Sequence, residues 1–287
     1  GVGGGIADAI GFILTNFGEM TRLWVRMQHQ GPAAERARRE KERSELKILV
    51  GTNLHRLSQL DGVTLDVYRE LVLEQVLEVV VNCKDTLAQE YLLECIMQVF
   101  PVEYHVATLS TLLRHLQHLS PATDQTVVLL NIMGRLKAHK PAADEPEEAS
   151  VFTPLVAHVA SAVRASAGAL GAAAVVALHA GLVDLAVGAY PARLAYVDSA
   201  LAVCANELAA AAVEVPLADK PAADALKKLL VQPFLSYESA LVGLDLEGWP
   251  RLLPFLAHPE QVEVSSAILS RLAEQGSVVS SPQVADK

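Results

Sequence analysis

The 287-residue sequence has few aromatic residues, few cysteines and no excess of positive charge. Aromatic residues make up 5% and hydrophobic residues 52%, which indicates a core of Leu, Val and Ala of the kind that closely packed helices form. The net charge of −10 and the pI near 5.4 argue against a nucleic-acid-binding protein, because such proteins are usually basic. Cys83, Cys95 and Cys204 share no C-x-x-C spacing, which favours buried thiols in a reducing cytosol over a disulfide framework.

The motifs of common enzymes are also missing. The sequence contains no G-x-S-x-G nucleophile elbow, and the glycine-rich residues 1–5 lack the G-K-[ST] that completes a phosphate loop. It has no Asp-Asp-x-x-Asp cluster of the kind expected in an all-helical isoprenoid enzyme. His115 and His118 could share a helix face, but a zinc site needs at least one further ligand and none stands at motif spacing. We therefore predict no catalytic residue, no metal site and no cofactor.

No signal-peptide pattern opens the chain, and one segment is long enough to span a membrane. Residues 169–190 consist mainly of Ala, Gly and Val, but they include His179 and Asp184, which would be costly in lipid. A buried helix is the preferred interpretation. The chain begins with Gly1 and not with Met, which we interpret as an internal fragment of a longer protein.

Helical periodicity runs through almost the whole sequence. In residues 86–100 one face of the predicted helix is apolar, Asp85 precedes it as an N-cap, and Pro101 ends it. The residues of that face are Ala88, Leu92, Cys95, Ile96 and Val99, whereas Gln89, Glu90, Glu94 and Gln98 fall elsewhere. A similar stripe in residues 66–81 contains Tyr68, Leu71, Val72, Val76 and Val79, and Asp61-Gly62 marks the turn before it.

The periodicity predicts about a dozen helices with short connections. The expected ranges are 6–29, 34–59, 65–81, 86–100, 104–118, 124–139, 152–166, 169–189, 192–210, 219–230, 233–243, 247–257 and 259–274. An aromatic-Pro step at a helix end occurs at Phe100-Pro101 and again at Tyr190-Pro191, a separation that fits two helix-pair repeats of roughly 40–47 residues each. We predict an all-α fold, an α-solenoid of stacked antiparallel HEAT-like helix pairs. It would form one continuous segment over residues 1–287, with an acidic loop at 140–150 and a flexible tail at 277–287.

Two groups of residues are candidates for partner binding. The predicted helix 34–59 carries mixed charges, interpreted either as a basic contact for an acidic partner or lipid headgroups, or as a solvated helix with i,i+4 ion pairs. Its bases are Arg36, Arg38, Arg39, Lys41, Arg43 and Lys47, and its acids are Glu35, Glu40, Glu42 and Glu45. The second group contains residue types that are enriched at protein interfaces, namely Trp24, Arg26 and Met27, and it also includes the neighbouring His29. Such residues also pack between repeats. The candidate contact residues are Trp24, Arg26, Met27, Arg36 and Arg39.

Several specific runs within residues 17–109 resemble one known family. They include Phe17-Gly18-Glu19-Met20, residues 24–31 (Trp-Val-Arg-Met-Gln-His-Gln-Gly), residues 48–60 and residues 87–101, and a thinner match continues in residues 190–198 (Tyr-Pro-Ala-Arg-Leu-Ala-Tyr-Val-Asp). These runs resemble the large vacuolar-sorting subunit of retromer, the α-solenoid scaffold of endosomal cargo retrieval.

The resemblance implies a non-enzymatic subunit, cytoplasmic and peripheral on endosome membranes, that reaches the membrane only indirectly. Its implied partners are an arrestin-like subunit, a phosphoesterase-fold subunit, sorting nexins, a small endosomal GTPase and cargo tails. The family's Pro-Arg-Leu-Tyr-Leu contact motif is missing from this sequence, so no binding residue of the family is assigned to a position here.

Two alternatives of other classes stay open at this point. A different α-solenoid scaffold, such as a coat-adaptor trunk or a phosphatase scaffold, would explain the repeats but not the runs at residues 24–31 and 51–60. An all-helical enzyme would need a cleft with clustered acids, histidines or a cofactor. We also expect marginal solubility, because the terminal repeats would leave apolar faces uncovered.

Overall fold

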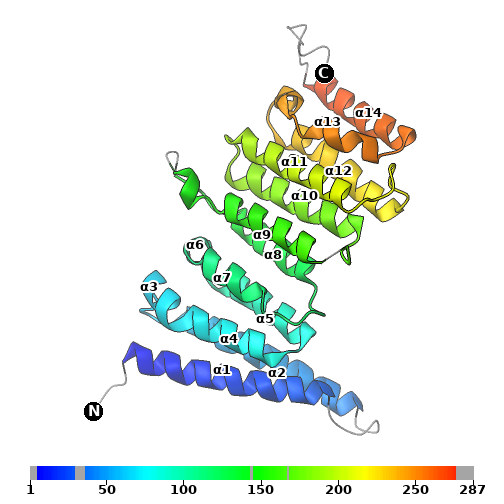
Figure 1. The fold of residues 1–287 in the computed structure, drawn as a ribbon. Helices are drawn as coiled ribbons and strands as arrows, with labels where there is room; N and C mark the ends of the chain where they lie inside the picture. Colours follow the sequence, from blue (N-terminus) through cyan, green and yellow to red (C-terminus); the bar gives the residue numbers. More distant parts are fainter. Residues whose placement is uncertain (1–4, 30–35, 143–144, 167, 276–287) are drawn as a thin grey trace. The chain divides into compact units, whose positions relative to one another are not determined.

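The computed structural model describes residues 5–29, 36–142, 145–166 and 168–275 (Figure 1). Within these ranges every regular element is a helix and no strand occurs, which confirms the predicted all-α fold. The chain forms two compact units, residues 1–135 and residues 136–287. In each unit, consecutive helices pack as antiparallel pairs and the pairs stack on their neighbours, as predicted for an α-solenoid.

The N-terminal unit begins with the hairpin of α1 and α2. Its helices are α1 (Ile6–His29), α2 (Arg36–Ser58), α3 (Leu65–Val67), a π-helix (Tyr68–Val72), α4 (Leu73–Cys83), α5 (Thr86–Val99), α6 (Val102–Ala107), α7 (Leu109–Leu116) and α8 (Gln125–Leu136). Helices α1, α4 and α7 form one row, and α2 packs on α5 in the other. Aromatic rings fill the space between the rows, since Phe17, Tyr68 and Phe100 are at most 2% exposed. Residues of α2, α5 and α8 line a groove on the surface of this unit.

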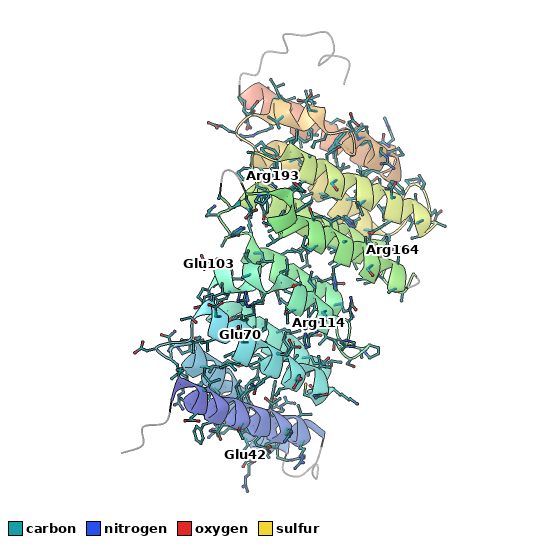
Figure 2. All side chains as sticks on the ribbon, turned by 60° about the vertical axis from the view of Figure 1, so that its left-hand side comes forward. Glu42, Glu70, Glu103, Arg114, Arg164 and Arg193 are labelled. Carbon is teal, nitrogen blue, oxygen red and sulfur yellow. The ribbon has the colours of Figure 1, made fainter. Side chains whose placement is uncertain are left out.

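The C-terminal unit repeats this two-row arrangement. Its elements are a 3₁₀ turn (Glu147–Ala149), α9 (Phe152–Ala165), α10 (Ala172–Ala189), α11 (Leu194–Ala210), α12 (Lys220–Ser236), a 3₁₀ segment (Ala240–Asp245), α13 (Trp249–Leu252), a 3₁₀ turn (Leu253–Phe255) and α14 (His258–Glu274). Helices α9, α11 and α13 form one row, and α10, α12 and α14 form the other. Arg164 and Arg193 lie at opposite ends of the α9–α11 layer (Figure 2).

Helix α10 lies in the core of the C-terminal unit. It is the one helix in the described ranges that is long and apolar enough to cross a membrane by length and composition, and half of its hydrophobic window is buried inside the protein. It packs against α9, α11 and α12, and it buries residues on several sides, from Val175 to Ala189. A helix that is apolar all round is expected at such a central position.

Several predicted helices differ from the observed ones. The range 104–118 is divided into α6 and α7, and the ranges 233–243 and 247–257 contain the end of α12, 3₁₀ segments and the short α13. The range 65–81 was expected to be one α-helix, but Tyr68–Val72 forms a π-helix that inserts an extra residue into the turn. The buried stripe therefore shifts, because Leu73, Val76, Leu77 and Val80 are buried whereas Leu71, expected in the core, is 37% exposed.

A break was also expected between residues 230 and 233. Instead α12 continues through Pro233, and Pro233 and Phe234 are both buried. Proline removes one hydrogen bond from a helix interior, but α12 packs against both α10 and α14. Tertiary packing thus overrides the local helix-breaking signal.

The side chain of Gln89 was placed outside the core by its polarity, and that expectation was wrong. Gln89 is fully buried, and its amide donates to the Val80 and Val81 carbonyls at 3.1 and 3.3 Å. Its side-chain oxygen accepts from the Ser120 amide at 2.9 Å and from the Thr123 hydroxyl at 2.7 Å. A buried amide is tolerated here because every polar group has a partner.

The predicted acidic loop at 140–150 is described except for residues 143–144, and Glu147–Ala149 in it form a 3₁₀ turn. Its mobility stays a prediction. The predicted tail at 277–287 lies outside the described residues.

Candidate protein-contact surface

The open face of the N-terminal unit contains a groove between α2, α5 and α8. Its volume is about 410 Å³, a size typical of ligand-binding clefts. The residues that line it are Trp24, Glu40, Arg43, Ser44, Lys47, Leu87, Glu90, Tyr91, Glu94, Val127 and Asn131. We call this the α2–α5–α8 groove. The groove brings Trp24, a candidate contact residue predicted from the sequence, together with residues of the charged helix α2.

Tyr91 of α5 is central to this groove. Its ring meets the Trp24 ring edge to face at a centroid distance of 5.5 Å, and the Lys47 ammonium lies 4.3 Å from the Tyr91 centroid. The Tyr91 hydroxyl donates to the Lys47 carbonyl at 3.0 Å, and burial raises its pKa above the usual value. The close approach of the Tyr91 side chain to α2 requires glycine at position 51, because a Cβ there would lie 2.5 Å from the Tyr91 hydroxyl oxygen. Gly51 therefore allows α2 and α5 to lie close together.

The edges of the groove differ in chemistry. On α5 and α8, Leu87 is 62% exposed and Val127 is 42% exposed. The Glu90 carboxylate accepts from the Asp124 amide at 3.1 Å, and the Glu94 carboxylate accepts from the Gln98 amide at 3.0 Å. An open apolar pair beside carboxylates is suited to contact with a protein segment.

The charged helix α2 is largely neutralised within itself. Arg38 pairs with Glu42 at 2.8 Å, Lys41 pairs with Glu45 at 3.9 Å, and Arg43 pairs with Glu40. All three pairs join residues three or four positions apart on exposed helix surface, where each contributes only a few tenths of a kcal/mol. The pairs favour a solvated helix. Glu35, which stands four positions before Arg39, lies outside the described residues.

The structure places the five candidate contact residues in different surroundings. Trp24 is 3% exposed and packs beneath Tyr91, so its ring supports the groove from the core side. Arg26 is exposed, and Met27 and Arg39 are half-buried. Arg36 begins α2, and its side chain is outside the described part. Partner contact by these residues stays a prediction.

Of the two histidines that were considered for a metal, His118 is exposed and His115 contacts groups of its own unit. The His115 Nδ1 is hydrogen-bonded to the Thr111 carbonyl oxygen at 2.9 Å, and the His115 Nε2 lies 3.8 Å from the Glu74 carboxylate. No group of three or more His, Cys, Asp or Glu suited to a metal ion occurs in the described part of the chain.

The run at residues 190–198 has structural functions in the C-terminal unit. The Tyr190 hydroxyl accepts a hydrogen bond from the Val151 amide at 3.1 Å. The Arg193 guanidinium donates to the Tyr196 hydroxyl at 2.6 Å, pairs with Glu147 at 3.3 Å and donates to the Glu145 carbonyl. These contacts hold the segment before α9 against the start of α11.

Further residues of this run fix α11 to its other neighbours. The Tyr196 ring stacks on Phe152 with centroids 4.3 Å apart, and the Asp198 carboxylate accepts from the Gly248 amide at 2.7 Å. A Cβ on Gly248 would lie 2.8 Å from the Ala202 nitrogen, so only glycine fits where α13 begins. Sequence reasoning found the run but missed Gly248, which carries no local signal that distinguishes it from a turn glycine.

A buried titratable pair joins α10 to α11. The Nε2 atom of His179 lies 3.3 Å from a carboxylate oxygen of Glu207, and their side chains are 0% and 7% exposed. Burial lowers the pKa of His179 to about 4 and raises the pKa of Glu207 to about 7, with Arg164 opposing the latter shift. The His179 Nδ1–H donates to the Val175 carbonyl at 2.9 Å, whereas the His179 Nε2 and the Glu207 carboxyl oxygens have no hydrogen-bond partner in the described part of the chain. Burial therefore favours the neutral form of both groups.

Comparison with known proteins relates the whole chain to one family. The family described as "Vacuolar protein sorting-associated protein 35" matches residues 1–287. Vacuolar protein sorting-associated protein 35C of Arabidopsis thaliana is 43% identical over 253 residues, covering 87% of this chain and 32% of that protein. The 35B protein of the same plant is 39% identical over 282 residues, covering 96% of this chain and 35% of its own length.

Vacuolar protein sorting-associated protein 35 of Dictyostelium discoideum is 34% identical over 283 residues, covering 98% of this chain and 36% of that protein. The chain thus spans about a third of the length of the curated relatives it matches. Because the match extends over both units, the resemblance that the N-terminal runs suggested holds for the entire sequence. The chain belongs to the vacuolar protein sorting-associated protein 35 family.

Proposed function

We propose that the protein is a non-enzymatic scaffold subunit of the retromer coat, and that this chain is part of its α-solenoid. The subunit links partner proteins for endosome-to-Golgi retrieval and for recycling of membrane cargo. The observation that carries the proposal is the family match over residues 1–287, on a chain whose described elements are stacked helix pairs. The names of the relatives also describe vacuolar protein sorting.

The stacked pairs suggest how such a scaffold acts. Each pair packs on its sequence neighbours, as α10 does on α9, α11 and α12, so stability is distributed over many nearest-neighbour contacts. A chain of this kind fixes the distance between proteins bound at separate positions along it and needs no bond chemistry. The open groove of the N-terminal unit offers a contact face on such a scaffold.

The proposed partners are an arrestin-like subunit, a phosphoesterase-fold subunit, sorting nexins, a small endosomal GTPase and the tails of cargo proteins. The proposed location is the cytoplasmic face of endosomes, with the membrane reached through these partners. The acidic net charge of −10 supports indirect attachment, because the cytoplasmic leaflet is itself negative.

Affinity purification of the full-length parent protein from its own cells, followed by mass spectrometry, tests this function. We expect near-stoichiometric recovery of an arrestin-like and a phosphoesterase-fold subunit. A parent protein that lacks the segment corresponding to this chain serves as the control and should no longer recover both subunits in one complex. Recovery of a different coat or of a phosphatase in place of these partners would overturn the proposal and leave only the family and the fold.

A further inference from the structure

The α5 edge of the α2–α5–α8 groove is acidic. Leu87, Glu90 and Glu94 follow one another on α5 at intervals of three and four residues, so their side chains form one ridge along the helix. Glu94 is exposed and Glu90 is half-buried. Each carboxylate accepts a hydrogen bond from an amide, at 3.0 and 3.1 Å, and no described lysine, arginine or histidine lies within ion-pair distance of either one. Both carboxylates therefore face the groove without a basic partner.

The basic residues of the groove lie on α2, where they are already engaged. Arg43 pairs with Glu40, and the Lys47 ammonium lies 4.3 Å from the centre of the Tyr91 ring. The lining contains three carboxylates against these two bases. The groove as a whole is therefore negative, and its negative charge is concentrated on α5.

Two apolar side chains stand open beside the carboxylates. Leu87 near the start of α5 is 62% exposed, and Val127 near the start of α8 is 42% exposed. Beneath them the Trp24 ring, 3% exposed, packs edge to face on Tyr91 and closes the floor of the groove. An apolar side chain of a partner that covers Leu87 and Val127 would remove their surface from water, which favours association.

The spacing of these groups is that of one helix laid along another. Glu90 and Glu94 are one turn apart, so they match two basic residues that are one turn apart on a partner helix. The same partner helix would present apolar residues beside its bases to Leu87 and Val127. A helix with an apolar stripe and a basic flank has this pattern, and insertion of such a helix into a groove between helices is a recurring mode of recognition.

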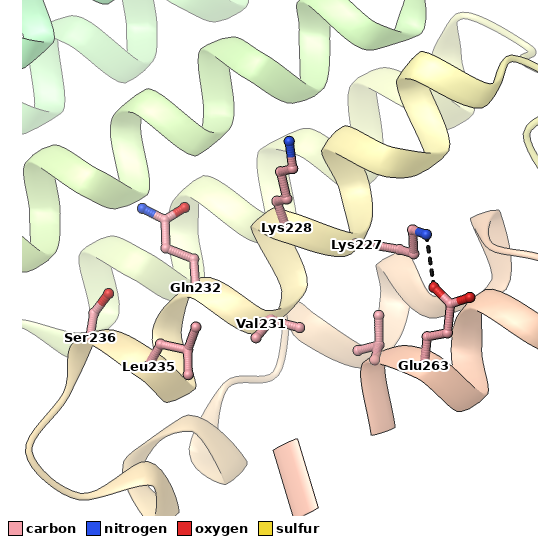
Figure 3. Close-up of a pocket in the computed structure, with 8 residues that line it drawn as sticks. Lys227, Lys228, Val231, Gln232, Leu235, Ser236 and Glu263 are labelled. Atoms are coloured by element: carbon pink, nitrogen blue, oxygen red, sulfur yellow. Dashed lines mark hydrogen bonds and ion pairs between the residues drawn. The ribbon is translucent and has the colours of Figure 1, made fainter. Parts of the chain in front are cut away.

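A groove of opposite charge in the C-terminal unit makes the expectation selective. It lies between α12 and α14, has a volume of about 550 Å³, and is lined in part by Leu235, which is 57% exposed. Lys227 and Lys228 also line it, and Lys227 pairs with Glu263 at 2.8 Å (Figure 3). A basic helix would meet like charges there and lose affinity.

We propose that the α2–α5–α8 groove binds an amphipathic helix of a partner protein whose apolar stripe is flanked by lysine or arginine residues. The bases pair with Glu90 and Glu94, and the apolar residues cover Leu87 and Val127. This inference goes beyond the scaffold function and does not depend on it, because the groove is complete within the N-terminal unit. Helix binding by this chain and recovery of partner subunits by the parent protein are separate measurements, so either can fail alone.

Fluorescence polarisation with the 287-residue chain tests the proposal. The probe is a fluorescein-labelled helical peptide, Ser-Ala-Ala-Lys-Leu-Ala-Ala-Lys-Leu-Ala-Ala-Lys-Ala-Gly, which places lysines and leucines one turn apart. Three control peptides replace every lysine by glutamate, both leucines by alanine, or the two central alanines by proline, which breaks the helix. We expect each control to bind at least about fivefold more weakly, and raised salt to weaken binding of the probe.

Substitutions in the groove should weaken binding of the probe. We expect Glu94→Lys to weaken it about fivefold, because the change reverses a charge that faces the lysines, and Leu87→Ser about fivefold, because it removes an apolar contact. The glutamate peptide should bind the Glu94→Lys chain more tightly than it binds the unchanged chain. A variant that was merely misfolded would not show this gain.

Two matched variants separate groove binding from general effects. Glu103→Lys makes the same charge change at an exposed position of the same unit, and Leu235→Ser removes a similarly exposed leucine from the groove between α12 and α14. Neither residue lines the α2–α5–α8 groove. Both variants should bind the probe as the unchanged chain does, and circular dichroism should show equal helicity in all variants.

Any of four results overturns the proposal. The first is the absence of saturable binding of the probe up to about 1 mM. The second is equal binding of the glutamate peptide, and the third is equal binding of the proline peptide. The fourth is a loss of affinity in Glu103→Lys or Leu235→Ser as large as in the groove variants. If sedimentation instead shows that Leu87→Ser abolishes self-association of a chain that ignores the probe, the groove binds a second copy and the proposal is wrong.

Discussion

Replacement of Gly51 by alanine tests how α2 and α5 are held together. Gly51 lies inside α2, and a Cβ there would lie 2.5 Å from the Tyr91 hydroxyl oxygen and 3.5 Å from the Cys95 sulfur. The Tyr91 ring would have to move, and its hydrogen bond to the Lys47 carbonyl at 3.0 Å would be lost. The ring also packs against Trp24, so the disturbance reaches the core of the N-terminal unit.

Three contributions decide the sign of the effect. Alanine in a helix interior is favoured over glycine by about 0.5–1 kcal/mol. Overpacking of a well-packed contact costs about 1–3 kcal/mol, and loss of the hydroxyl hydrogen bond costs about 1 kcal/mol. We therefore expect Gly51→Ala to lower the free energy of unfolding by about 1–3 kcal/mol. Gly134 provides the control, because nothing lies within 4 Å of a Cβ placed there and Gly134→Ala should stabilise α8 by about 0.5–1 kcal/mol.

Urea unfolding followed by tryptophan fluorescence measures these values. The chain has two tryptophans, one in each unit, so a Trp249→Phe background leaves Trp24 as the reporter of the N-terminal unit. The additional change Tyr91→Phe removes the clashing oxygen and should restore most of the stability that Gly51→Ala loses. The reasoning is refuted if Gly51→Ala is as stable as its parent, or if Tyr91→Phe adds a further loss to it instead of relieving the clash.

Three further predictions concern the remaining polar contacts. Between about pH 4.5 and 6.5 the His179–Glu207 pair binds one proton in the folded chain and one in the unfolded chain. Above that range the folded chain keeps a proton that the unfolded chain has released. The free energy of unfolding therefore falls as the pH rises towards 7. Glu207→Gln should therefore gain stability relative to the unchanged chain from pH 5 to pH 7.5 in thermal melts, and a constant difference would contradict the assigned pKa shifts. Arg193→Gln should speed amide hydrogen exchange in residues 145–152, whereas unchanged exchange would show that the arginine does not hold this segment. Gln89→Leu should cost about 2–3 kcal/mol in urea unfolding, because the buried groups that Gln89 bonds lose their partner, and a neutral effect would mean that water replaces it.

The helices and several of their ends could be predicted from sequence because these features depend on near neighbours. Asp85 caps α5 by accepting from the Ala88 amide at 2.8 Å, as its position before an apolar run predicted. The turn at Gly62 has a φ of +95°, which glycine adopts without strain. Helix α14, expected at 259–274, spans His258–Glu274. Such signals lie within one helical turn of the feature that they determine.

Where prediction failed, a distant contact overrode a local preference. Pro233 should end a helix, but α12 continues through it because α10 and α14 pack along both sides. Gln89 is polar and was expected at the surface, yet partners more than thirty residues away, Ser120 and Thr123, satisfy it inside the core. The π-helix at Tyr68–Val72 shifts the apolar stripe by one position, and the sequence pattern of that range gave no sign of it.

The candidate contact surface likewise could be predicted only in part from the sequence. Sequence identified Trp24 and the charged helix but missed Tyr91, Leu87 and Val127, which complete the α2–α5–α8 groove. Leu87 and Val127 are apolar, yet they are 62% and 42% exposed.

The sequence by itself determined that this chain is helical, which faces of its helices are apolar, and which family its specific runs resemble. These properties depend on residue order over short ranges and on identity at particular positions. Only the tertiary structure decided which apolar residues stay open, which polar residues are buried, and why Gly51 and Gly248 must be glycine. The physical reason is that burial and close approach arise between helices far apart in the chain, as between Lys47 and Tyr91 or between Glu147 and Arg193, where local periodicity carries no information.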